Sequence, residues 1–140
     1  MNLIAEYNKK LEPMKVITGV AMKVHGKYRP GLLESAYEAA MEYLLKKDGH
    51  QVERQKMLPI YWEDVRLDQD YRMDLVIDNI ICELKAVKHT TEEHVRQLWN
   101  YMHLTHTEYG MLINFGADRL YSAWYHRDPA TGIIEKVKMF

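Results

Sequence analysis

Apolar residues recur at helical spacing in the first third of the chain. The segment from about Pro13 to His25 carries β-branched residues three to four positions apart, which predicts a helix with one buried stripe. Pro30 stands at the start of a second stripe of helical period, and a proline suits the first turn of a helix. The second predicted helix therefore runs from Pro30 to the stop signal at Gly49.

In the middle of the chain, residues typical of β-strands take over from apolar residues at helical spacing. Residues 52–62 and 71–87 are rich in β-branched and aromatic residues, and polar stretches around 63–64 and 68–70 separate them. The second run contains the turn signal Asp78-Asn79, since both residue types tolerate the left-handed backbone of a two-residue hairpin turn. Together these segments predict a three-stranded antiparallel meander.

The last third of the chain combines one helix with further strands. Thr90, followed three residues later by Glu93, has the form of a capping box and predicts a helix that ends near Thr105. Residues 109–115 are apolar nearly throughout, which is typical of a central strand, and the preceding helix allows parallel pairing with an earlier strand. A closing hairpin around residues 128–132 completes the predicted order α-α-β-β-β-α-β-β-β, an α/β fold.

The two-residue turn determines which side chains of the central hairpin share a face. With Ile77 opposite Ile80, pairing inward from the turn places Asp74 opposite Glu83. Alternation along the strand puts Lys85 on the same side as Glu83. Facing residues have Cβ atoms roughly 5 Å apart, so two facing carboxylates destabilise a sheet unless a positive group compensates them.

Two facing carboxylates and a nearby lysine suit metal-assisted attack of water on a phosphodiester. Carboxylate oxygens are preferred ligands of Mg²⁺, and the cation lowers the pKa of water that it binds. The ammonium group of Lys85 could hold the attacking water or offset charge in the transition state. The alternative is an ordinary solvent-facing row of charges, because such residues also alternate with apolar ones on exposed strands. The hairpin alone leaves both interpretations open.

Composition narrows the class of protein without specifying a function. A chain of 140 residues and 16.6 kDa is expected to form one domain, residues 1–140. The lone Cys82 excludes a disulfide framework within the chain and is expected to be a buried small hydrophobe. With neither a signal-peptide pattern nor a membrane-length apolar run, we expect a cytoplasmic protein that makes no membrane contact. A formal net charge of -1 leaves any contact with a polyanion to local clusters and bound metal.

Three motifs carry a resemblance to a known family. Asp74 followed by Glu83-Leu84-Lys85 resembles the catalytic motif of the PD-(D/E)XK nuclease superfamily, with Met73 where a proline sometimes precedes the aspartate. The segment Gln97-Leu98-Trp99-Asn100-Tyr101 is similar to the Gln-x-x-x-Tyr helix motif of the RecB-like and phage-exonuclease-like branches. Upstream, Gly31-Leu32-Leu33-Glu34-Ser35-Ala36-Tyr37 matches the Gly-x-x-Glu-x-x-Tyr (GxxExxY) signature of a small bacterial and archaeal family within that superfamily.

The resemblance implies a fold, an activity and a set of site residues. The implied fold is a restriction-endonuclease-like core, a mixed sheet flanked by helices. The implied activity is Mg²⁺- or Mn²⁺-dependent hydrolysis of phosphodiester bonds in DNA or RNA. Asp74, Glu83 and Glu34 would be the metal ligands. Lys85 would act on the water and the transition state, with Gln97 in support.

Substrate contacts are predicted for three further residues, each with a simpler alternative. By resemblance Tyr101 would orient substrate, although it could instead belong to a polar fringe beside the core stripe of its helix. Tyr37 could contact substrate or be a core aromatic, and Lys88, which follows the Glu-x-Lys strand, could contact a phosphate or be a solvated surface residue. A noncatalytic module that binds nucleic acid or protein for regulation is the alternative function on the same fold. A nuclease active only inside a larger nucleic-acid-processing complex is a third interpretation. The exposed edge of a closing hairpin also allows a homodimer.

Overall fold

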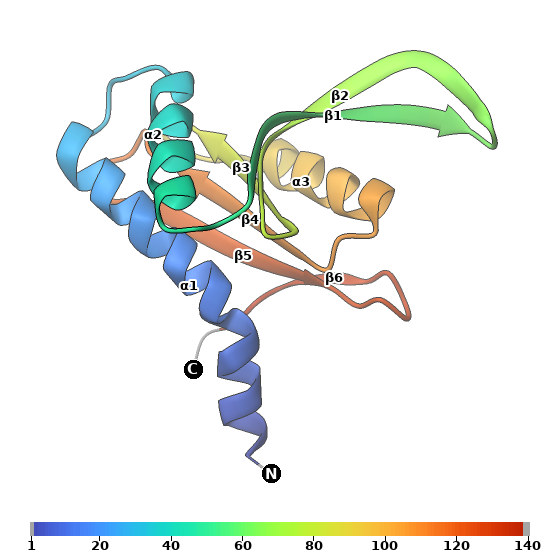
Figure 1. Ribbon diagram of the computed structural model, residues 1–140, viewed down its shortest axis with the longest axis horizontal. Coiled ribbons are helices and arrows are strands. Elements are labelled where there is room, and N and C mark those ends of the chain that lie inside the picture. The colour runs from blue at the N-terminus through green and yellow to red at the C-terminus, as the bar shows by residue number, and fades with distance from the viewer. Residues whose placement is uncertain (1, 139–140) are drawn as a thin grey trace.

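The computed structural model describes residues 2–138, and it confirms the α/β class and the predicted order of elements (Figure 1). The elements are α1 (Leu3–Tyr28), α2 (Glu34–Lys47), β1 (Val52–Trp62), β2 (Val65–Ile77), β3 (Ile80–Lys85), α3 (Glu92–Thr105), β4 (Tyr109–Asn114), β5 (Tyr121–Arg127) and β6 (Ile134–Lys136). Among the described residues, no helix combines the length and the apolarity that crossing a bilayer requires.

All of the strands form one mixed sheet in the order β1-β2-β3-β4-β5-β6. The β3 and β4 strands pair in parallel, as the sequence predicted for residues 109–115, and the other neighbours pair antiparallel. The α3 helix makes the crossover that parallel neighbours need. It lies on one face of the sheet, while α1 and α2 lie on the other (Figure 1).

Strand alternation divides the buried side chains into two cores. Leu75, Cys82 and Leu84 belong to the core under α1 and α2, whereas Ile81 and Leu112 pack with α3. Cys82 is fully buried, which confirms that it acts as a small hydrophobe. Burial raises the pKa of its thiol well above the ordinary value of a cysteine.

The hairpin register agrees with the prediction. Ile77 pairs with Ile80, and the ladder continues inward to Leu75 opposite Cys82. The two turn residues, Asp78-Asn79, have φ angles of 47° and 69°, the left-handed conformation expected of a two-residue hairpin turn. The β2–β3 ladder ends at Leu75 and Cys82, just before the two predicted acids.

The first helix begins ten residues earlier than the sequence pattern predicted. Asn2 caps α1, because its side-chain oxygen accepts hydrogen bonds from the backbone N–H groups of Ile4 and Ala5, each at 3.1 Å. Pro13, where the predicted helix began, lies inside this helix. Burial of Leu11 on the sheet side stabilises the extra turns despite the proline.

The second helix begins later than predicted, at Glu34 rather than Pro30. Arg29 and Gly31 have φ angles of 57° and 124°, so the chain turns sharply around the proline before the helix starts. Glu34 is therefore in the first turn of α2, where the helix dipole favours an acid.

Two further predictions are wrong in detail. The capping box of α3 is formed by Thr91 and His94 rather than Thr90 and Glu93, so the helix starts at Glu92. Residues 68–70, predicted as part of a loop, belong to β2, and a turn at Glu63-Asp64 joins β1 directly to β2. Outer parts of these strands, residues 56–73, form a hairpin that we call the arm; it extends beyond the sheet on the α3 side (Figure 1).

The end of β3 is held by the side chain of Asn114, which is 1% exposed. Its Oδ1 accepts hydrogen bonds from the N–H groups of Val87 and Gly116, each at 3.0 Å, and its Nδ2 donates to the Val87 carbonyl at 2.8 Å. Gly116 lies so close to Val87 that an added Cβ would clash with the Val87 backbone. The segment that follows Lys85 is thereby fixed against the end of β4.

We expect Gly116→Ala to lower the free energy of unfolding by about 1–3 kcal/mol, the usual cost of overpacking. A Cβ at Gly19, in α1, has no neighbour within 4 Å. Gly19→Ala is the matched control and should raise stability by about 0.5–1 kcal/mol through helix propensity. Urea denaturation of both variants measures the difference, and equal effects of the two substitutions would contradict the close packing at Gly116.

Candidate active site

Where β2 and β3 separate, hydrogen bonds to the side chains of Asp74 and Glu83 take the place of backbone hydrogen bonds between the strands. The backbone N–H of Asp74 donates to Glu83 Oε2 at 3.1 Å, and the N–H of Leu84 donates to Asp74 Oδ2 at 2.8 Å. Each carboxylate thus bonds to the opposite strand in place of a backbone carbonyl. These contacts hold the two strands apart and leave both acids at the opening.

Glu83 is the most buried acid of the site, with 2% of its surface exposed. Burial, reinforced by the negative charge of Asp74, raises the pKa of Glu83 well above its ordinary range, although Lys85 opposes the shift. In the metal-free protein a proton on Glu83 is therefore favoured at pH values where an exposed glutamate is ionised.

The α2 helix brings two more acids to the opening. Glu34 and Glu38 are four residues apart on one side of α2, and their carboxylate oxygens and that of Asp74 lie within 4.8 Å of one another. Burial and the negative charge of Asp74 raise the pKa of Glu34, while the positive charge of Lys85 lowers it. Sequence reasoning missed Glu38; its spacing from Glu34 is the signal that could have identified it.

Glu38 and Asp74 are linked by the side chain of Gln55. Its Nε2 lies 3.0 Å from each Glu38 oxygen and 3.3 Å from Asp74 Oδ1. Gln55 has a φ of 51° and stands across from Asp74, where the β1–β2 pairing passes from Arg54–Leu75 to Lys56–Met73. The sequence offered no signal for this role, because it depends on an irregularity in β1.

Arg54 completes the support of Glu38 from the same strand. Its Nε donates to Glu38 Oε1 at 2.7 Å, and its Nη2 donates to the carbonyl of Ser35 at 3.2 Å. Glu38 is 3% exposed, and a buried carboxylate is destabilising unless it is paired and hydrogen-bonded, which these contacts achieve.

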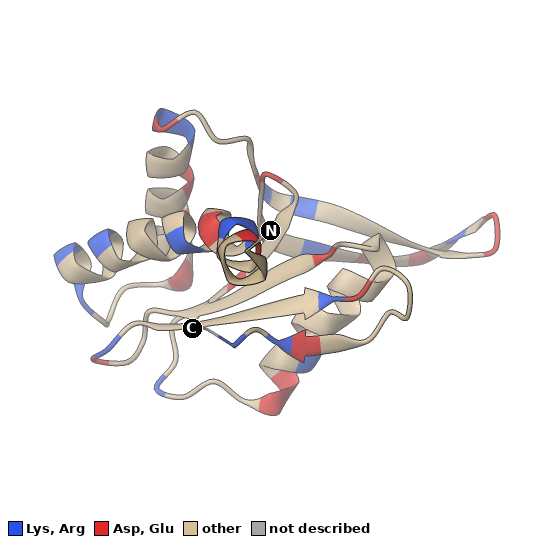
Figure 2. Ribbon diagram, turned by 90° about the horizontal axis from the view of Figure 1, so that it is seen from below, with Lys and Arg blue, Asp and Glu red and all other residues tan. Residues whose placement is uncertain are grey.

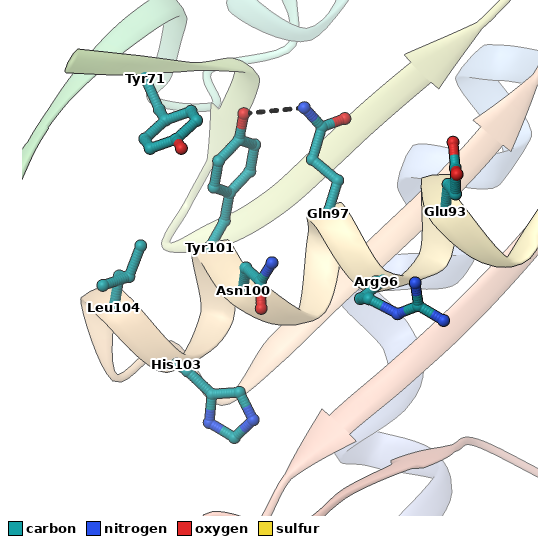
Figure 3. Close-up of a pocket in the computed structure, with 8 residues that line it drawn as sticks. All are labelled: Tyr71, Glu93, Arg96, Gln97, Asn100, Tyr101, His103 and Leu104. Atoms are coloured by element: carbon teal, nitrogen blue, oxygen red, sulfur yellow. Dashed lines mark hydrogen bonds between the residues drawn. The ribbon is translucent and has the colours of Figure 1, made fainter. Parts of the chain in front are cut away.

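The α3 helix supplies the side of the site opposite α2. Gln97 Nε2 donates to the Tyr101 hydroxyl at 3.1 Å (Figure 3). Burial and then the negative charge of Glu83 raise the pKa of Tyr101 to about 12. Burial and then the positive charge of Lys85 lower the pKa of His94. The α3 helix packs against β3, and Tyr101 belongs to one buried cluster with Met73 and Ile81, so these side chains lie beside the hairpin.

Two predicted substrate-contact residues lie outside this group. Tyr37 is 0% exposed; its hydroxyl donates to the Arg29 carbonyl at 2.5 Å and accepts from the Leu32 N–H at 3.1 Å. Its ring stacks on Phe115 at a centroid distance of 4.7 Å. A side chain with no exposed surface cannot touch substrate, so Tyr37 is the core aromatic of the two alternatives. Lys88 is exposed beyond β3 and borders a different cavity, near Asn114.

The four carboxylates suit a hard divalent cation. Mg²⁺ and Mn²⁺ take oxygen ligands, and Asp74, Glu34 and Glu38 bring such oxygens close together from β2 and α2. Glu83 adds a fourth carboxylate in direct contact with Asp74. The donor set and its spacing therefore fit the metal that the motif implies.

We expect the stability of the metal-free protein to fall as the pH rises above about 4.3, the pKa of a glutamate in the unfolded chain. Folded Glu83 keeps its proton to a higher pH, so its stabilising effect is complete at low pH and is lost through its raised pKa. Glu83→Gln should flatten this dependence at pH values above the unfolded-state pKa, with Glu34, whose pKa is also raised, responsible for the remainder. Urea denaturation with a chelator present measures it. Glu53→Gln, an exposed control, should keep the parental slope; an unchanged slope in Glu83→Gln would contradict the burial effect.

Comparison with known proteins supports the motif resemblance. No curated protein and no solved structure matches the chain. A family model described as the PD-(D/E)XK nuclease superfamily matches residues 12–126, which include the acids of α2, the hairpin and the α3 motif. The mixed six-stranded sheet flanked by helices is consistent with the restriction-endonuclease-like core of such proteins. The chain belongs to the PD-(D/E)XK nuclease superfamily.

Proposed function

We propose that this protein is a divalent-metal-dependent nuclease that hydrolyses phosphodiester bonds of DNA or RNA, and that it belongs to the GxxExxY family near the RecB-like branch. The observation that carries the proposal is the group of carboxylates at the separated end of the β2–β3 hairpin, with Lys85 on the same strand as Glu83. A purely structural row of surface charges would not require buried acids supported by an arginine and a glutamine.

Asp74, Glu83 and Glu34 are the proposed ligands of Mg²⁺ or Mn²⁺. Glu38 joins them as a carboxylate that the sequence did not indicate. When bound, the cation would supply a Lewis acid that lowers the pKa of water and offsets negative charge on the phosphate. Ionised Glu83 is the form that can act as a ligand, so metal binding and loss of its proton are coupled.

Lys85 is the proposed catalytic cation. It is half-buried at the end of β3, close enough to Glu34 and His94 for its charge to alter the pKa of both. An ammonium group in this position can orient an attacking water or stabilise charge that develops on the phosphate in the transition state. The Asn114 contacts that hold the end of β3 limit the movement of this lysine.

Gln97 and Tyr101 are proposed positioning residues. They come from α3 and share a hydrogen bond, so each limits the conformations of the other. The Gln97 carbonyl oxygen remains available to accept a hydrogen bond from water or from the Lys85 ammonium group. Lys88 is proposed to contact a phosphate farther along the substrate, because it is exposed three residues beyond Lys85.

In this protein, binding of a polyanion must depend on a small group of residues at the site rather than on the overall charge. Figure 2 shows basic and acidic residues interspersed over most elements, in keeping with the formal net charge of -1. Steering by a general positive field is therefore weak, and affinity depends on the site and the bound cation. The same charge pattern also permits a noncatalytic regulatory module, the second candidate function.

We expect calorimetric titration with Mn²⁺ to show binding that is at least roughly tenfold weaker in Asp74→Asn and Glu34→Gln. Glu38→Gln tests the additional carboxylate and should weaken binding similarly. Glu53→Gln, on the exposed side of β1, is the control and should bind as the parent does. Parental affinity in Asp74→Asn would refute the metal site.

We expect the parent to cleave labelled oligonucleotides only with Mg²⁺ or Mn²⁺ present. Glu83→Ala and Lys85→Ala should lower the rate by roughly 100-fold or more, the scale of losing one transition-state contact. Lys56→Ala, an exposed lysine paired with Glu53 on the arm, serves as the control. Variants that cleave like the parent would disprove the catalytic roles. A parent that binds Mn²⁺ but cuts no DNA or RNA would support the noncatalytic module or a nuclease that needs a larger complex.

A further inference from the structure

A cavity beside α3 has no role in the reaction proposed above. It measures about 530 Å³ and opens between the base of the arm and the outer side of α3 (Figure 3). Tyr71 lines it from β2, and the other lining residues come from α3. The size falls within the usual range of small-molecule sites, so a ligand as large as a nucleotide fits.

One end of the cavity lies next to the proposed catalytic residues. Gln97 and Tyr101 line the cavity and also form the α3 side of the site. Tyr101 belongs to the same buried cluster as Met73, the residue before Asp74, and Ile81 of β3, which places this end of the cavity beside the hairpin that carries the acids. A molecule held in the cavity would therefore be continuous with a phosphate at the site.

The cavity has an exposed aromatic wall. Tyr71 is 43% exposed, and its ring centroid is 6.1 Å from that of Tyr101 at an interplanar angle of 58°. The two rings are tilted, so they do not cover each other's faces. A planar base can therefore stack on Tyr71 from the cavity side.

The α3 side offers polar groups for the rest of a nucleotide. Arg96 and Asn100, four residues apart, are both exposed and line the cavity (Figure 3). Within residues 2–138, the Arg96 guanidinium group takes part in no ion pair, which leaves its donors for a phosphate. The Asn100 amide can donate to and accept from the edge of an unpaired base.

We propose that this cavity holds an unpaired nucleotide next to the scissile phosphate, so that the substrate is single-stranded nucleic acid. The inference rests on the proposed nuclease function and specifies its substrate class. A duplex keeps its base faces stacked and its edges paired, so it offers Tyr71 no base face and Asn100 no free edge. The arm extends on the same side of the sheet as α3 (Figure 1), and the cavity lies between Tyr71 at the base of the arm and the residues of α3.

Fluorescence anisotropy with labelled oligonucleotides tests this inference on the full chain. The probes are single strands of DNA and of RNA with one sequence, together with their duplexes, in Ca²⁺ instead of Mg²⁺ to limit cleavage. We expect the parent to bind at least one of the single strands roughly tenfold or more tightly than its duplex. Tyr71→Ala should weaken strand binding by roughly 5- to 100-fold, as loss of one base–aromatic stack predicts, and Tyr71→Phe should bind like the parent.

The matched control is Tyr61→Ala, a tyrosine on the same arm that is 55% exposed and does not line the cavity. Duplex binding as tight as strand binding would overturn the inference. The inference would also be overturned if Tyr71→Ala bound single-stranded oligonucleotides as tightly as the parent does. An equal loss of affinity in Tyr71→Ala and Tyr61→Ala would overturn it too. Cleavage of duplexes with no preference for strands would refute this substrate class and leave the nuclease function intact. Strand binding through Tyr71 without metal-dependent cleavage would refute the catalysis and leave the binding site intact.

Discussion

The hydrogen bonds between Asp74 and the β3 strand are the interaction on which the rest of the site depends. They replace backbone pairing at the point where β2 and β3 separate, and they keep two acids at the opening. Because the strands separate there, α2 can bring its acids from one face of the sheet and α3 its glutamine and tyrosine from the other. A fully paired hairpin would confine the carboxylates to a single face.

This concentration of acids opposes folding, and the surrounding residues offset part of the cost. Glu38 is paired with Arg54 and Gln55, while Glu83 is favoured in its protonated form when metal is absent. A protein selected only for stability would replace such groups with apolar residues. Buried acids held by such contacts are what the proposed metal site requires.

Sequence patterns predicted those features that depend on neighbouring residues. The register of the central hairpin followed from one turn and strand alternation, which together predict Asp74, Glu83 and Lys85 on one face without any family motif. The start of α1 was missed because the Asn2 cap and the burial of Leu11 outweigh the local signal of a proline. Whether a helix continues through a proline depends on tertiary packing, which local sequence does not show.

Features that depend on packing between distant elements could not be predicted. The contacts of Gln55 with Glu38 and Asp74 require α2 to pack on β1 and require a left-handed residue within a strand, which no local pattern announces. Tyr37 illustrates the same limit, because a family signature marks a position without distinguishing substrate contact from core packing. Its hydroxyl in fact joins the ends of the α1–α2 loop.

The irregular pair Gln55 and Asp74 also marks where the arm begins, and this has a mechanical consequence. Beyond this pair, β1 and β2 are paired only with each other, whereas before it they are anchored to β3 and α2. The base of the arm is also fixed on the other side, because Met73 is buried in the cluster with Tyr101 and Leu98 of α3. The Gln55–Asp74 contact therefore joins the first residues of the arm to the carboxylate group, so a change in the position of the arm at this point would alter the geometry of the acids.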